Sequence, residues 1–158
     1  MAVTRDDGGT ALLLSGSIGM GHAAMAEAVA ASLEERCWST RTADVMAMLG
    51  GTGHRLGERV FRLLLATPGA FDALHFGALR QGNTVARWLE RTAVRRTVPS
   101  LRDRLAAERP DLVVSVFATA AAATAALRPE FPDLRALTFC SDLNPHRLWV
   151  HPPPTATW

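Results

Sequence analysis

The sequence predicts an α/β fold, with a mostly parallel, Rossmann-like sheet and helices on both of its faces. Short apolar runs of strand length alternate along the chain with longer stretches that have helical spacing. A glycine-rich turn, Gly16–Gly21, directly follows the first apolar run. The 158 residues, 48% hydrophobic and 20% charged, are enough for about one domain with a buried core.

The first half of the pattern begins with a strand at Thr10–Ser15, where apolar residues follow one another between glycines. His22–Arg36 is predicted as a helix, because apolar residues recur three or four positions apart. Thr40–Val45 is expected to form a second strand. Helices are then expected at Glu58–Leu65 and Phe71–Leu79.

The second half of the pattern opens with a long helical stretch, Thr84–Glu108, which Pro99 is expected to interrupt or to restart as a new helix. Pro110 ends this stretch. A strand is then predicted at Leu112–Phe117, a helix at Thr119–Leu127 and a further strand at Leu134–Cys140. A short last strand is expected at Trp149–Val150.

Positive charge is concentrated in the middle of the chain. Residues 41–109 hold twelve Arg against six acidic residues, whereas the formal net charge of the whole chain is only +2. The same stretch is rich in large apolar residues such as Trp88. Basic helices with an apolar face can lie on anionic lipid, or they can cover a sheet with Arg turned to water. The sequence leaves both interpretations open.

The cysteine count and the apolar runs limit the class of protein. Two cysteines, Cys37 and Cys140, cannot form a disulfide framework, so we expect a reduced, cytoplasmic compartment. No secretory signal pattern is present at the start. The run Ala11–Leu14 is far shorter than the roughly 20 residues of a membrane span. We expect no nucleic-acid partner.

The first place to look for chemistry is the glycine-rich segment after the first strand, because ligands of parallel sheets bind at the carboxyl ends of strands. It is not a P-loop, since no Gly-Lys-Ser/Thr follows and the chain has no Lys. It matches a dinucleotide fingerprint, Gly19-x-Gly21-x-x-Ala24, with Asp44 as the later acidic residue. His22, in the first turn of the helix, can act as a neutral base at the mouth of a cleft or can simply cap the turn.

The second place is the segment after the last well-defined strand. It gathers a carboxylate, an amide, two imidazoles and an indole: Asp142, Asn144, His146, Trp149 and His151. Such side chains can orient a substrate or a catalytic partner. They can also satisfy their own loop, with Trp149 in the core. The spacing is not that of a zinc site, so we expect no metal.

Together the two segments resemble a known family. SGSIGMGHxxxAxA and SDLNPHRLWVHP look like the amino-terminal half of the monogalactosyldiacylglycerol synthase and processive diacylglycerol glucosyltransferase family. The first motif is more distantly similar to the glycosyltransferase that completes peptidoglycan lipid II. RPDLVVSVFA, at Arg109–Ala118, is similar to the Lys-Pro-Asp strand of the family. The resemblance covers roughly residues 11 to 152.

The resemblance implies one half of a GT-B glycosyltransferase, with no cofactor and a UDP-sugar as donor substrate. Residues 1–151 would be the acceptor-binding domain and 152–158 a linker or tail. The nucleotide-sugar domain would be absent or supplied as a separate carboxyl-terminal half, so the chain alone is expected to be inactive. The enzyme would be peripheral on the inner face of the membrane and would transfer a hexose to diacylglycerol or a related lipid.

The same resemblance assigns expected roles to residues of this chain. His22 would be the catalytic base at the acceptor hydroxyl. A set of polar, glycine and aromatic positions would line the acceptor cleft: Ser15, Ser17, Gly19, Gly21, Asp142, Asn144, His146, Trp149 and His151. Four arginines would contact the anionic membrane: Arg59, Arg62, Arg87 and Arg91.

Two positions depart from the pattern of the family. Ala23 stands where Arg or Lys often follows the motif histidine, and Phe117-Ala118 stands where a His-Pro pair is usual. Two other interpretations therefore remain open. The chain could be a dinucleotide-binding Rossmann module that uses Asp44, or a non-catalytic protein that binds a membrane surface.

Overall fold

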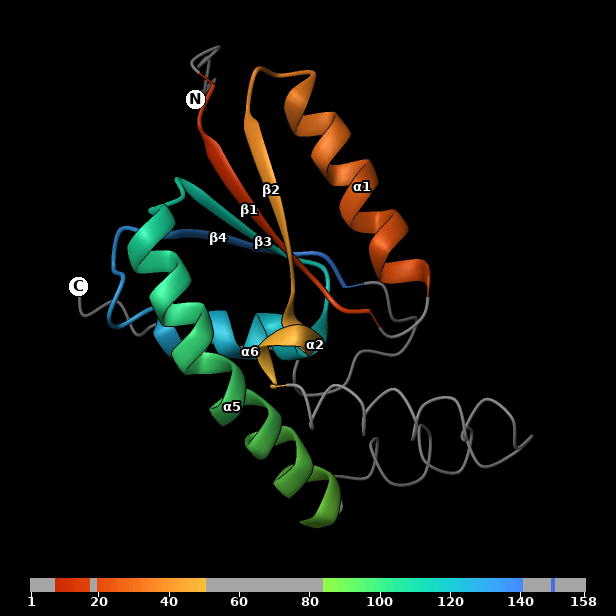
Figure 1. Cartoon of the computed structure of the whole chain (residues 1–158), viewed down its shortest axis with the longest axis vertical. Helices are drawn as coiled ribbons and strands as arrows, with labels where there is room; N and C mark the ends of the chain where they lie inside the picture. Colours follow the sequence, from red (N-terminus) through yellow and green to blue (C-terminus); the bar gives the residue numbers. More distant parts are fainter. Residues whose placement is uncertain (1–7, 18–19, 51–83, 141–148, 150–158) are drawn as a thin grey trace, which may run out of the picture.

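The computed structural model describes residues 8–17, 20–50, 84–140 and 149, and it confirms the predicted α/β, Rossmann-like fold (Figure 1). Four strands form one all-parallel sheet in the order β2-β1-β3-β4. The strands are β1 (Thr10–Ser15), β2 (Ser39–Asp44), β3 (Leu112–Ser115) and β4 (Arg135–Thr138). The helices in the described part are α1 (Met20–Glu34), α2 (Val45–Met48), α5 (Thr84–Glu108) and α6 (Ala118–Leu127).

Helices cover both faces of this sheet, with α1 on one side and α5 and α6 on the other (Figure 1). Alternate side chains of a strand point to opposite faces. In β1, Leu12 and Leu14 therefore join the core under α5 and α6, whereas Ala11 and Leu13 pack under α1. All four side chains are almost completely buried. A strand that is buried on both faces has a continuous run of apolar residues in the sequence. For this reason both ends of β1 could be predicted correctly.

Helix α5 passes through Pro99 without a break, so the predicted interruption is wrong. Proline removes one backbone donor, which leaves the carbonyl of Arg95 without its usual partner from the same helix. Both residues are exposed, so water can take that place. Apolar residues on both sides of the proline, such as Val98 and Leu101, pack onto the same core and hold the two halves in line.

Other predicted boundaries differ by one or two residues. Helix α1 starts and ends two residues earlier than expected, and β3 ends at Ser115. Trp149 lies in a 3₁₀ turn and not in a strand, which corrects the last predicted element as far as that residue is described. The expected helices at 58–65 and 71–79 lie outside the described residues. None of the helices in the described part is long and apolar enough to cross a membrane.

The strand order creates a switch point at the middle of the sheet. From β1 the chain crosses to β2 on one side, and it later returns to place β3 on the other side of β1. The loops that leave β1 and β3 therefore run in opposite directions from the carboxyl ends of these two strands, the place where open α/β sheets bind ligands. The start of α1 and the start of α6 meet at this edge (Figure 1).

At the opposite edge, Asp111 fastens β3 to β1. Its Oδ2 accepts hydrogen bonds from the backbone N–H of Thr10 at 2.8 Å and from the Thr10 hydroxyl at 3.0 Å. These bonds, the backbone one first, lower the pKa of the Asp111 carboxyl from its ordinary value of 3.8. The ionised carboxylate therefore stabilises the fold above that pKa.

We expect Asp111→Asn to destabilise the chain at pH 7 by on the order of 1 kcal/mol, a small value because these groups are exposed. A carboxyl group with a lowered pKa loses its contribution as the pH falls through that pKa. The difference between wild type and variant should therefore shrink below about pH 4. Urea unfolding at pH 7 and at pH 3 measures it. Asp103→Asn removes the same charge from the exposed side of α5 as a control, and an equal loss in both variants at pH 7 would contradict the role of Asp111.

Candidate functional site

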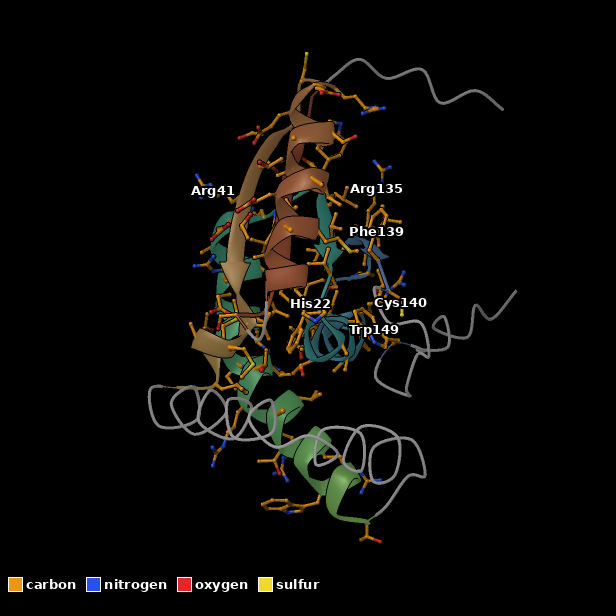
Figure 2. All side chains as sticks on the ribbon, turned by 90° about the vertical axis from the view of Figure 1, so that its right-hand side faces the viewer. His22, Arg41, Arg135, Phe139, Cys140 and Trp149 are labelled. Atoms are coloured by element: carbon orange, nitrogen blue, oxygen red, sulfur yellow. The ribbon has the colours of Figure 1, made fainter. Side chains whose placement is uncertain are left out.

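His22 lies between the first turn of α1 and the start of α6 (Figure 2). It is the third residue of α1 and is partly buried. Its Nδ1 lies 2.8 Å from the backbone carbonyl oxygen of Val116, the first residue after β3. A carbonyl oxygen can only accept a hydrogen bond, so Nδ1 must carry the hydrogen and donate it. In the neutral ring Nε2 then holds the lone pair and is the nitrogen that can take up a proton.

Val116 is held in place by the sheet, so the partner of His22 is a fixed group. Its backbone N–H donates to the carbonyl of Leu14 at 3.0 Å, which continues the pairing of β1 with β3. Its side chain is completely buried. The residue therefore connects β1, β3 and α1, and it presents its carbonyl at the end of the sheet.

Asp44 connects the glycine-rich turn to the second strand. The sheet register places it opposite Ser15, at the carboxyl end of β2. Its Oδ1 accepts a hydrogen bond from the N–H of Met46 at 2.8 Å, which caps α2, and another from the N–H of Ser17 at 3.2 Å. These two bonds give one oxygen of this carboxylate a structural role. In dinucleotide-binding folds the corresponding acidic residue binds the ribose instead.

Ser15 is a buried polar residue at the same edge. The residue is 6% exposed, and its hydroxyl has no hydrogen-bond partner among the described residues. The alternation of β1 places it on the face covered by α1, the face to which Val116 also belongs. An unpaired buried hydroxyl costs stability, about 1–3 kcal/mol in typical cases. The contacts with the described residues therefore give the hydroxyl at this position no stabilising role.

Trp149 packs against the beginning of α6. Its indole is 7% exposed and lies against Ala118 and Ala121 on α6 (Figure 2). His22 thus contacts the segment that links β3 to α6, whereas Trp149 contacts α6 itself, and the contacts of Trp149 are those of a core residue. The predicted site residues Gly19, Asp142, Asn144, His146 and His151 lie outside the described residues. Ser17 and Gly21 are exposed, and Gly21 directly precedes His22 in α1.

The partner of His22 was not predictable from the sequence. Every residue has a backbone carbonyl, so the residue types do not indicate which carbonyl binds His22. From the sequence, Val116 is simply an apolar residue near the end of a predicted strand. Phe117 was noted only as a departure from a family pattern, yet its ring contacts the imidazole of His22, with centroids 5.1 Å apart and an interplanar angle of 80°. Within residues 8–17, 20–50, 84–140 and 149, no three His, Cys, Asp or Glu side chains gather as metal ligands.

A separate groove lies at the opposite edge of the sheet. It has a volume of about 690 Å³ and is lined by the end of α5 and by residues 130–135, which lead into β4. Because it opens near the amino ends of β3 and β4, the strands separate it from His22. It is not part of the candidate site.

Comparisons with known protein families, curated proteins and solved structures give no match to this chain.

The hydrogen bonds of Asp44 predict different losses of stability for its substitution by alanine and by asparagine. Asp44→Ala removes the cap of α2 and the bond to Ser17 and should cost about 0.5–2 kcal/mol, whereas Asp44→Asn keeps an acceptor oxygen and should cost less. Urea unfolding measures both. In parallel, calorimetry with NADH tests the dinucleotide interpretation. Tight binding that Asp44→Ala abolishes, in a variant that stays folded, would contradict a purely structural role for this carboxylate.

Proposed function

We propose that this chain is the acceptor-side domain of an inverting GT-B glycosyltransferase, which transfers a hexose from a UDP-sugar to diacylglycerol or a related lipid. The single observation that carries the proposal is the placement of the His22 imidazole at the switch point of the sheet, with Nδ1 bound to the Val116 carbonyl. This geometry suits a general base that works through Nε2. The resemblance of the two sequence motifs to the diacylglycerol glycosyltransferase family supplies the reaction.

In the proposed reaction the hydroxyl oxygen of the acceptor attacks the anomeric carbon of the sugar, and the bond from that carbon to the diphosphate breaks. UDP leaves with the bonding electrons, and the configuration at the carbon inverts. Nε2 of His22 takes the hydroxyl proton as the attack proceeds. The imidazolium that forms keeps its Nδ1–H directed at the Val116 carbonyl, whose negative end stabilises the new positive charge.

The membrane is the proposed source of the acceptor, and α5 offers a surface for it. Trp88 is 63% exposed, and Arg91 and Arg95 are exposed three and seven positions further along. This spacing puts the three side chains on one face of the helix. An exposed indole beside two guanidinium groups suits the interface of an anionic bilayer. Of the four predicted membrane contacts, Arg91 is exposed, Arg87 lies on α5, and Arg59 and Arg62 lie outside the described residues.

Transfer is expected only when a nucleotide-sugar-binding half is joined to this domain or mixed with it. In that assembled enzyme, His22→Gln should lower kcat by about 10²–10⁴-fold, because Gln can still donate to the Val116 carbonyl but cannot act as a base. Radiolabelled UDP-sugar and diacylglycerol vesicles provide the assay, and far-UV circular dichroism confirms the fold. A rate within about twofold of wild type would remove His22 from catalysis.

The α5 surface predicts a charge-dependent affinity for lipid. The double variant Arg91→Gln/Arg95→Gln should bind vesicles rich in anionic lipid at least tenfold more weakly, at about 1 kcal/mol per arginine near the surface. Trp88→Ala should weaken binding at both low and high salt, because its contribution is apolar. Sedimentation with vesicles measures this. Arg41→Gln, which removes an exposed charge from β2, serves as the control, and equal losses in all variants would contradict an α5-specific surface.

A further inference from the structure

Phe117 occupies a position where its side chain contributes nothing to the helix that it begins. It is the N-cap of α6, with extended backbone angles (φ −137°, ψ 136°) and no side-chain cap hydrogen bond. Ser, Thr, Asn and Asp are preferred at N-caps because their side chains satisfy an orphan N–H of the first turn. The chain therefore forgoes a cap at this helix and places an aromatic ring there instead.

The ring of Phe117 lies between the glycine-rich turn and His22. On one side it covers Gly16 so closely that an added Cβ there would lie 2.8–2.9 Å from three of its ring carbons. Side chains essentially never approach that closely, so a residue larger than glycine would displace the ring. On the other side, Phe117 meets the imidazole of His22 in an edge-to-face arrangement, with centroids 5.1 Å apart.

We propose that Phe117 is a positioning residue for His22, and that Gly16 is required to seat it. The hydrogen bond to Val116 fixes the position of one atom of the imidazole. The edge-to-face contact fixes the plane of the ring. With both restraints the neutral imidazole keeps one orientation and one tautomer, with the hydrogen on Nδ1 and the lone pair on Nε2. Only the catalytic consequence of this arrangement rests on the proposed function.

A purely structural role for Phe117 makes a different prediction, because the ring also packs against the core beneath α5 and α6. If core packing were its whole purpose, its loss would lower stability and leave the state of the His22 ring unchanged. Phe117→Asn separates the two roles, because asparagine supplies the missing cap of α6 and removes the ring. Phe117→Leu keeps apolar bulk and removes only the aromatic edge.

The test uses the full chain with ¹⁵N-labelled histidine, and long-range ¹H–¹⁵N NMR spectra at a pH where the ring is neutral. Wild type should show one His22 tautomer, with the hydrogen on Nδ1. Phe117→Asn, Phe117→Leu and Gly16→Ala should each give a mixture of the two tautomers. Gly21→Ala is the matched control, because a Cβ there meets nothing within 4 Å. Its spectrum should match wild type.

Two results would overturn the proposal: an unchanged His22 tautomer in folded Phe117→Leu and Gly16→Ala, or an equal disturbance in Gly21→Ala. The assembled transferase adds an independent readout, in which Phe117→Leu should lower kcat at least tenfold with little change in KM for either substrate. If NMR shows the predicted mixture but wild type transfers no sugar, the proposed function fails and the positioning role stands. If transfer requires His22 but is indifferent to Phe117, the positioning role fails alone.

Discussion

The hydrogen bond from Nδ1 of His22 to the carbonyl of Val116 is the interaction on which the candidate site depends. It joins the first turn of α1 to the end of β3, two segments more than 90 residues apart in sequence. A carbonyl does not titrate, so this partner holds the same tautomer over the whole pH range in which the ring is neutral. A carboxylate partner would lose its charge in acid.

The sheet makes that carbonyl a rigid reference point. β1 lies between β2 and β3 and is buried on both faces, and Val116 is hydrogen-bonded to Leu14 at the end of this central strand. Asp44, at the end of β2, holds the glycine-rich turn through the hydrogen bond that its carboxylate accepts from the Ser17 N–H. The site is thus supported by the best-buried part of the molecule, although its polar groups lie at the surface edge of the sheet.

The sequence predicted the layers of the fold and the place of His22 at the start of a helix after β1, because both depend on local patterns. The apolar run predicted both ends of β1 correctly. The glycine-rich turn placed His22 at the edge of the sheet where the carboxyl ends of the strands lie. Two kinds of feature could not be predicted. Pro99 stays within α5 because tertiary packing on both sides outweighs the local rule. The orientation of the His22 ring depends on a backbone oxygen and on the shape of Phe117, which residue types do not encode.

A scalar coupling across the hydrogen bond tests the central claim most directly. In a chain labelled with ¹⁵N and ¹³C, we predict a cross-peak between Nδ1 of His22 and the carbonyl carbon of Val116. The bond from the Val116 N–H to the Leu14 carbonyl provides an internal standard in the same sample. If the standard is observed and Nδ1 of His22 couples to another carbonyl or to none, the imidazole is not held by Val116, and the catalytic geometry is contradicted.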